Sequence, residues 1–207
     1  MDLNRFLNFK CALFDLDGVV FDTEPQYTLF WRSEFQHYYP EEPGMEMRIK
    51  GMALTEIYER FLKEFEEEWP AITQRLNGFE AKMQFVYVEG FADFVNQLRG
   101  HGIKTAVVTS SNRAKMVNVY KKCPEFESYF DRVFTAEDFA KSKPDPDCYL
   151  RGMKYFGCSA SETLVFEDSI NGLRSAKASG GMVVGLTTSN PESVVGEYAD
   201  IMIPNYK

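Results

Sequence analysis

Histidine is scarce in this 207-residue chain, and its few cysteines are not paired in the sequence. Two histidines are too few for the usual zinc sites, and the four cysteines form no Cys-x-x-Cys motif. These counts exclude a typical structural zinc centre and a thioredoxin-like redox motif. We therefore expect buried or unreactive thiols at Cys11, Cys123, Cys148 and Cys158.

The chain also lacks a basic excess and a long apolar run. Its formal net charge of -8 leaves no basic stripe that neutralises a phosphate backbone, which argues against nucleic acid as a partner. No apolar stretch has the length needed to cross a bilayer, and the first ten residues mix charged with apolar side chains. We expect a cytoplasmic protein without membrane contact, and nothing in the sequence demands a partner chain, so we expect a monomer.

Short apolar runs alternate with segments of helical periodicity. Between two of these runs, Phe91, Phe94, Val95 and Leu98 follow the spacing of a helix that buries one face. Alternation of this kind predicts an α/β fold with a Rossmann-like parallel sheet covered on both faces. The expected strands are residues 11–14, 105–108, 132–135, 164–166, 182–186 and, at the edge, 201–203.

One region breaks the alternation, because residues 24–86 show helical patterns with no convincing strand. We expect helices over 24–39, 55–69 and 72–86, the first beginning at a capping box formed by Thr23 and Gln26. The sequence thus predicts a small α-helical cap domain, residues 23–86, inserted into a core domain made of residues 1–22 and 87–207.

Acids, hydroxyls and a lysine follow the expected strands. Because ligands of open parallel sheets bind beyond the carboxyl ends of the strands, these side chains are candidates for one site. Carboxylates crowded there repel one another unless a cation neutralises them, and an all-oxygen set suits Mg²⁺ better than zinc. The residues are Asp15 and Asp17 after the first run, Thr109, Ser110 and Ser111 after the second, Lys143 after the third, and Glu167 and Asp168 after the fourth.

Four motifs in this order resemble the haloacid dehalogenase-like phosphatase superfamily, in the branch of β-phosphoglucomutases and sugar-phosphate phosphatases. The first, D-x-D-G-V/T, stands as Asp15-Leu16-Asp17-Gly18-Val19, and the second, a strand-terminal Ser/Thr, as Thr109. The third is Lys143 in a K-P-x-P-x element, and the fourth is the pair Glu167-Asp168. The resemblance covers essentially the whole chain, and it implies a Rossmann-like core with an inserted helical cap.

The resemblance also implies a mechanism of phosphoryl transfer. Asp15 would attack phosphorus and form an aspartyl phosphate, and Asp17 would protonate the leaving oxygen and later activate water. Lys143 and Thr109 would stabilise the phosphoryl charge. The residues implied to hold Mg²⁺ are Asp15, Asp17 through its carbonyl, Glu167 and Asp168, and those implied to contact substrate are Gly18, Ser110 and Ser111. In the cap, Lys50 and also Arg48 are cations that could reach a polar or anionic end of the substrate, with a solvated role as the alternative.

Two departures from the β-phosphoglucomutases favour a phosphatase over a mutase. Tyr27 stands where they have a histidine, and no arginine follows Lys50-Gly51 to bind a second phosphate. The expected function is therefore hydrolysis of a small phosphomonoester such as a sugar phosphate. Mutase-type transfer between sugar hydroxyls remains one alternative, and a non-catalytic protein that binds a phosphorylated metabolite remains another.

Each motif has a purely structural alternative. Asp15 and Asp17 suit a turn before glycine, and a lysine such as Lys143 or Lys50 is solvated in most proteins. Ser111 or Asn112 fits the N-cap of the helix expected to start at Arg113, and Asp168 or Ser169 fits the N-cap of the next helix. The joint occurrence of all four motifs at strand ends favours the functional interpretation.

Overall fold

Six parallel strands form one sheet in the computed structural model, which describes residues 3–207. Their order across the sheet is β3-β2-β1-β4-β5-β6, so the winding direction changes at β1. This arrangement confirms the predicted α/β fold with a parallel sheet. The strands are β1 (Cys11–Phe14), β2 (Lys104–Val108), β3 (Arg132–Phe134), β4 (Thr163–Glu167), β5 (Met182–Leu186) and β6 (Ile201–Ile203).

The register of the central strands aligns their carboxyl ends. Phe14 of β1 pairs with Val107 of β2 and with Phe166 of β4. The amide of Asp15 continues the ladder by donating to the carbonyl of Phe166 at 3.0 Å. The residues that follow β1, β2 and β4 therefore emerge at the same edge, where a change of winding direction opens a crevice.

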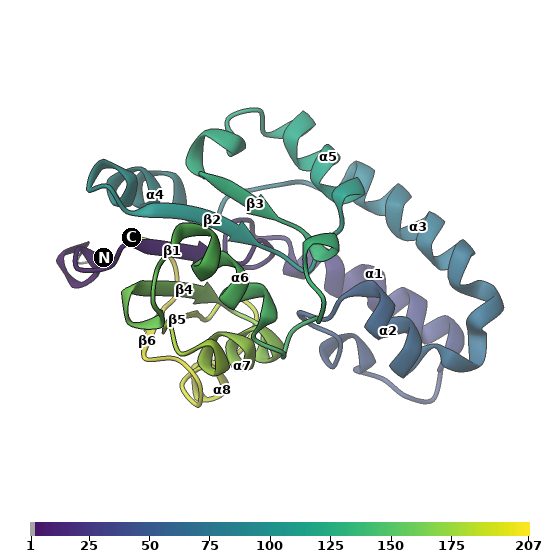
Figure 1. Cartoon of the computed structure of the whole chain (residues 1–207). Coiled ribbons are helices and arrows are strands. Elements are labelled where there is room, and N and C mark those ends of the chain that lie inside the picture. Colours follow the sequence, from purple (N-terminus) through teal and green to yellow (C-terminus); the bar gives the residue numbers. More distant parts are fainter. Residues whose placement is uncertain (1–2) are drawn as a thin grey trace.

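Helices cover both faces of the sheet. Side chains of α4 (Phe91–Gly100) and α5 (Arg113–Lys122) share one buried apolar cluster, and those of α6 (Asp147–Phe156), α7 (Ile170–Ser179) and α8 (Glu192–Val195) share another. Figure 1 shows α4 on the opposite side of the strands from α6, α7 and α8. The remaining short turns outside the helical segment are 3-10 helices over Leu3–Phe6, Phe126–Tyr129, Ala136–Asp138 and Ala160–Glu162.

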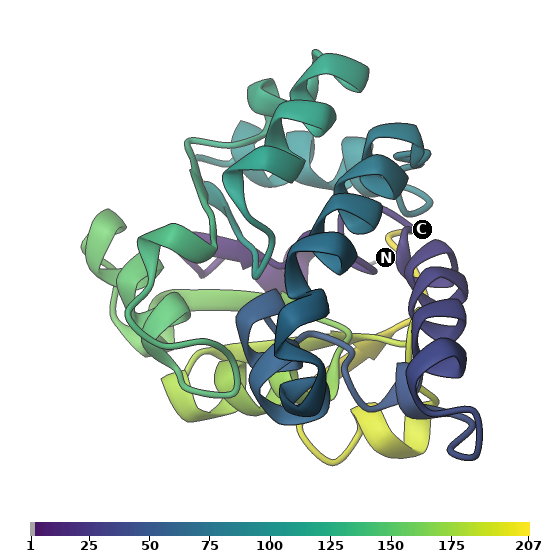
Figure 2. The same cartoon turned by 90° about the vertical axis from the view of Figure 1, so that its right-hand side faces the viewer.

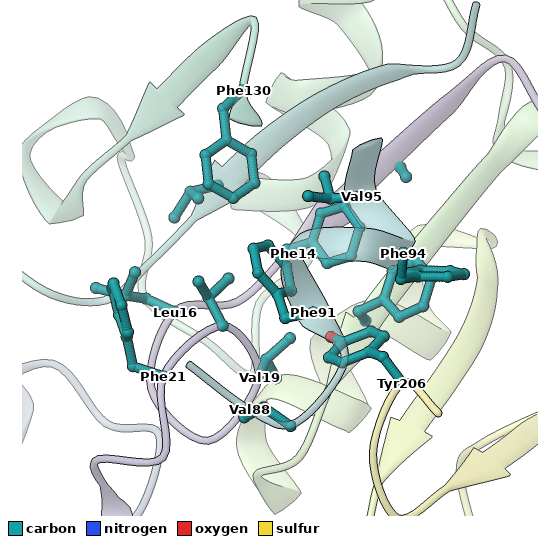
Figure 3. Close-up of a cluster of buried hydrophobic side chains, with 14 of the residues drawn as sticks. Phe14, Leu16, Val19, Phe21, Val88, Phe91, Phe94, Val95, Phe130 and Tyr206 are labelled. Atoms are coloured by element: carbon teal, nitrogen blue, oxygen red, sulfur yellow. The ribbon is translucent and has the colours of Figure 1, made fainter. Parts of the chain in front are cut away.

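Aromatic rings dominate the core under α4. Phe14 stacks on Phe166 with ring centroids 4.4 Å apart, and the edge of Phe91 meets Phe14 at 5.7 Å. Tyr206 closes this cluster against Phe94 (Figure 3). Burial of each such ring stabilises the fold by roughly 2–3 kcal/mol, so the strands that carry the site are held by the largest side chains of the core.

A helical insertion, residues 24–82, lies beyond the carboxyl ends of the strands. Figure 1 shows the arrowheads of β1 and β2 pointing toward it, and Figure 2 shows its helices in front of the sheet. The insertion has its own apolar cluster around Trp31, Phe35, Leu62 and Ile72, while the domain boundaries at 22/23 and 86/87 stay a prediction. Its elements are α1 (Glu24–Tyr38), a 3-10 turn (Met45–Met47), α2 (Leu54–Phe61), a longer 3-10 segment (Lys63–Glu68) and α3 (Trp69–Lys82).

Two expected helices of this insertion differ from the structure. The helix expected over 55–69 ends at Phe61, because Leu62 leaves helical geometry and the Trp69 indole donates to its carbonyl at 2.8 Å. The ring of Tyr58 stacks on that of Trp69, so packing between α2 and α3 replaces helical continuity. The helix expected over 72–86 ends at Lys82, since the next residues are extended and lead back to the core.

The predicted capping box at the start of α1 is wrong. The Thr23 hydroxyl donates to the Asp17 carboxylate at 2.5 Å and caps no amide. The Gln26 side chain instead exchanges two hydrogen bonds with the backbone of Gln84, which lies 58 residues later. Both side chains therefore form tertiary hydrogen bonds instead of capping the helix.

The chain enters and leaves the insertion through two linkers that lie side by side. The Asp22 amide donates to the Val86 carbonyl at 2.8 Å, and the Val88 amide donates to the Val20 carbonyl at 2.9 Å. Phe21 and Tyr87 form an isolated antiparallel bridge between them. The paired linkers thus connect the insertion to the core directly after Asp17.

Composition-based expectations agree with the structure where it tests them. The four cysteines carry free thiols, and three of them are buried. Within residues 3–207, none of the helices combines the length and the hydropathy required to traverse a bilayer.

Candidate active site

A cavity of about 500 Å³ lies between the strand ends and the helical insertion. Eight of the ten residues singled out by the sequence line it, and the other two, Gly18 and Glu167, lie behind its wall. The structure therefore brings the four motifs together at one place. The eight lining residues are Asp15, Asp17, Lys50, Thr109, Ser110, Ser111, Lys143 and Asp168.

Lys143 connects two carboxylates at the end of the sheet. Its ammonium donates to Asp15 at 2.7 Å, to Glu167 at 2.6 Å and to the Val108 carbonyl at 3.2 Å. The lysine is only 2 % exposed, and burial opposes its charge, but the two carboxylates raise its pKa. Lys143 therefore stays an ammonium ion that holds Asp15 in place.

Glu167 is fully buried, and both of its carboxylate oxygens have partners. One oxygen accepts from Lys143 and from the Tyr149 hydroxyl at 2.7 Å. The other accepts from the amides of Asp168 and Ser169 at 2.9 and 3.2 Å. Because these donors fill its lone pairs, Glu167 orients the lysine and the loop after β4 in this structure.

Asp168 differs, because its Oδ1 atom is buried without a hydrogen-bond partner. Its other oxygen accepts from the Ser189 hydroxyl. Burial, together with repulsion from Glu167, Glu24 and Asp15, raises the pKa of Asp168 well above its ordinary value. A buried carboxylate oxygen in this state lacks a positive partner.

That missing partner fits a divalent cation. Carboxylate oxygens of Asp15, Glu167 and Asp168 lie within 4.8 Å of one another, all three residues being buried. An all-oxygen set with one unsatisfied ligand atom is typical of a hard cation site. The donor set at the end of β1 and β4 is therefore suited to hold a divalent metal ion.

The carboxyl group of Asp15 is strongly perturbed by its surroundings. Burial raises its pKa to about 7, against the opposing charge of Lys143, and repulsion from Glu167 and Asp17 adds to the rise. A group whose pKa lies near neutrality is common where a carboxylate takes part in chemistry. A cation beside it would favour the ionised, nucleophilic form.

Asp17 is held by donors on three different elements. Thr23 donates to one carboxylate oxygen, and the other accepts from the Ser111 hydroxyl at 3.1 Å and from the ammonium of Lys115. Lys115 is 1 % exposed, and its ammonium lies 4.6 Å from the centroid of the Tyr27 ring. Asp17 is thus fixed from the insertion side and from α5.

Lys115 is the main functional candidate that the motif analysis missed. It lies on the same face of α5 as the buried residues Met116 and Val119. A lysine on the apolar face of a helix is unusual, because its charge must find a buried partner. The position of Lys115 on this apolar face could have marked it as a candidate from the sequence alone, but it does not identify Asp17 as its partner.

The loop after β2 and the turn after Asp17 complete the core side of the site. Thr109 is 1 % exposed, and its hydroxyl accepts from the Ser111 amide at 3.0 Å. Gly18 has a φ of +76°, and a Cβ there would lie 2.0 Å from Asp168 Oδ2, so only glycine fits. The amide of Gly18 is already donated to the Phe21 carbonyl at 2.7 Å. Of the two candidates considered for each N-cap, the side chain of Asn112 caps α5 and that of Ser169 caps α7.

The insertion contributes a second set of polar residues to the cavity. Lys50 lies 3.5 Å from Glu24 and donates to the Ser189 carbonyl at 3.3 Å. Tyr27 donates to Glu80 at 2.7 Å, and burial raises the pKa of both side chains. The sequence interpretation named Lys50 as a candidate substrate contact but did not single out Glu24 or Glu80.

Known proteins resemble this chain along most of its length. The family model described as haloacid dehalogenase-like hydrolase matches residues 12–186. Validoxylamine A 7'-phosphate phosphatase of Streptomyces hygroscopicus subsp. limoneus is 27% identical over 200 residues, covering 94% of this chain and 93% of the relative. Phosphorylated carbohydrates phosphatase of Thermotoga maritima is 25% identical over 189 residues, covering 83% of this chain and 82% of the relative.

The fold is also similar to that of solved structures. The β-phosphoglucomutase of Clostridium difficile superposes with a TM-score of 0.77 at 19% identity, covering 96% of this chain and 92% of that one. The family resemblance drawn from the four motifs is thereby confirmed. Because the matching model covers most of the chain, including the insertion and all four motifs, the chain belongs to the haloacid dehalogenase-like hydrolase family.

Proposed function

We propose that this protein is a Mg²⁺-dependent phosphatase that hydrolyses a small sugar phosphate through an aspartyl phosphate on Asp15. This proposal rests on one observation. Asp15, which is paired to buried Lys143 at 2.7 Å, lines the same cavity as Asp168, whose Oδ1 atom has no hydrogen-bond partner. The names of the two relatives, both phosphatases of phosphorylated carbohydrate-like compounds, support the substrate class.

In the first step a carboxylate oxygen of Asp15 attacks phosphorus, and the bond from phosphorus to the leaving oxygen breaks. Asp17, two residues along the same loop, gives its proton to the leaving alkoxide. Asp15 and Asp168, with the Asp17 carbonyl, would hold Mg²⁺, which neutralises phosphate charge when it is bound. Lys143 and the Thr109 hydroxyl stabilise the same developing charge from the protein side.

In the second step Asp17 takes a proton from water, whose oxygen attacks phosphorus of the aspartyl phosphate. The acyl-phosphate bond breaks, inorganic phosphate leaves, and the carboxylate of Asp15 is restored. Covering of the cavity by the helical insertion limits the access of bulk water during this cycle. Contacts of the Lys50-Gly51 loop with Ser189, Ser110 and Asn171 support a closed arrangement.

The test is turnover of p-nitrophenyl phosphate with Mg²⁺ by the wild-type protein and by Asp15→Asn. We expect release of p-nitrophenol by the wild-type protein and at least about a thousandfold loss in the variant, because the nucleophile is removed. Equal release from both proteins would refute the role of Asp15. Binding of phosphate without any turnover would instead favour the non-catalytic alternative.

A further inference from the structure

The lining of the cavity is rich in carboxylates. Among the described residues that line it, seven are acidic and three are lysines, with no arginine. Three of the acids, Glu24, Glu46 and Glu80, come from the helical insertion, and Glu46 is paired with Arg32 at 2.9 Å. Acids therefore outnumber lysines in the lining, and Glu24 and Glu80 are the lining acids of the insertion that no arginine of the described residues pairs with.

The lysines of the lining are already engaged with acids. Lys143 binds Asp15, Lys50 lies 3.5 Å from Glu24, and Lys141 lies 3.1 Å from Asp145 at the exposed rim. Glu80 has only a neutral donor, the Tyr27 hydroxyl, and is 6 % exposed. Within the part of the chain that the structure describes, the lining thus offers no unpaired cation to a second anionic group.

Apolar side chains form the rest of this wall. Trp31, Ile49, Ile57 and Leu76 all line the cavity and are at most 6 % exposed. An anionic group placed against them loses its water and gains no positive partner, which is strongly unfavourable. Hydroxyl groups can donate to the carboxylates, and an ammonium group can do so with the added strength of a charge-assisted hydrogen bond.

We propose that Glu24 and Glu80 select the leaving group by charge, so that the enzyme accepts monophosphates of neutral polyols, prefers amine-bearing ones and rejects substrates with a second anion. This inference rests on the proposed phosphatase function and specifies its substrate class. It assigns a role to two residues of α1 and α3 outside the four motifs. It also explains why the cavity has an acidic wall although the reacting phosphate is itself an anion.

The test uses two pairs of esters, each differing in one group. Sorbitol 6-phosphate and 6-phosphogluconate differ by a hydroxymethyl against a carboxylate, and glucose 6-phosphate and glucosamine 6-phosphate by a hydroxyl against an ammonium. We expect kcat/KM to be about tenfold or more higher for sorbitol 6-phosphate than for 6-phosphogluconate, and about threefold or more higher for glucosamine 6-phosphate than for glucose 6-phosphate.

The variants Glu24→Gln and Glu80→Gln keep the shape of each side chain and remove its charge. In either variant we expect the kcat/KM ratio within each pair of esters to move toward one by about threefold or more. Glu67→Gln is the matched control, because Glu67 is an exposed acid of the same insertion and lies outside the cavity. Its ratios should equal those of the wild-type protein.

The possible failures are distinguishable. Hydrolysis of 6-phosphogluconate at least as fast as sorbitol 6-phosphate overturns the charge selection and leaves the phosphatase intact. Wild-type-like ratios in both glutamine variants overturn the assignment to Glu24 and Glu80. Absence of turnover on all four esters and on p-nitrophenyl phosphate refutes the proposed function, and this inference with it.

Discussion

Replacing Lys143 by methionine should destabilise the protein by about 3–5 kcal/mol, because it leaves buried carboxylates without their cation. Lys143 pairs with Asp15 and Glu167 at 2.7 and 2.6 Å, and Glu167 has no exposed surface. A loss of this size is a large share of the roughly 5–15 kcal/mol that stabilises an ordinary domain. For a chain of this length it corresponds to a fall in Tm of roughly 6–20 °C.

Thermal unfolding followed by circular dichroism at pH 7, in EDTA, measures this loss without a metal contribution. Lys141→Met is the matched control, since Lys141 is 70% exposed and its surface ion pair with Asp145 contributes little to stability. The double variant Lys143→Met/Glu167→Gln should recover part of the loss, because it removes one of the two repelling charges. A Tm for Lys143→Met within about 2 °C of the wild-type value would refute this reasoning.

Three further predictions concern other parts of the molecule. Mg²⁺ should raise the wild-type Tm, by an amount equivalent to about 2.7 kcal/mol at a hundred times its Kd, and should leave the Tm of Asp168→Asn unchanged in the same titration. Gly172→Ala should cost about 1–3 kcal/mol in urea unfolding, because the new Cβ would lie 1.9 Å from a Glu167 oxygen, whereas Gly78→Ala meets nothing within 4 Å and should be neutral or stabilising. Asp131→Asn should lower stability at pH 7 by at most about 1 kcal/mol because solvent screens this partly exposed group, and the deficit should shrink progressively as the pH falls below 3.8. Burial opposes but hydrogen bonds outweigh it in lowering the wild-type pKa, so that contribution is lost as the acid protonates.

The sheet was predictable from the sequence because its central strands β1 and β4 are buried throughout and its strands alternate with segments of helical periodicity. Strand β1, with every residue buried, reads as a continuous apolar run that ends at Asp15. Parallel pairing then brings Asp15 and Asp168 to one edge from distant parts of the sequence. The motifs at strand ends therefore sufficed to locate the core half of the site.

The other half depends on packing between elements, which periodicity does not encode. Thr23 and Gln26 form a plausible local cap, but Asp17 and Gln84 offer stronger tertiary partners. Lys115 is bound to Asp17 across 98 residues, which requires the orientation of α5 against the insertion.

The break at Leu62 has a similar origin, since the sequence pattern of the helix continues through it. The indole of Trp69 binds the Leu62 carbonyl and ends α2 there. Glu80 likewise occupies an ordinary helical position, and only the packing of α3 against α1 brings it to the cavity.

The paired linkers at residues 20–23 and 86–88 allow the helical insertion to vary without a change in the core. Because the chain departs from the core and returns to it through adjacent hydrogen-bonded segments, the ends of the inserted helices meet at one point. Evolution can lengthen, shorten or exchange everything between them without altering the order of the strands. Changes within the inserted helices can thus alter the lining of the cavity while Asp15 and Lys143 of the core keep their arrangement.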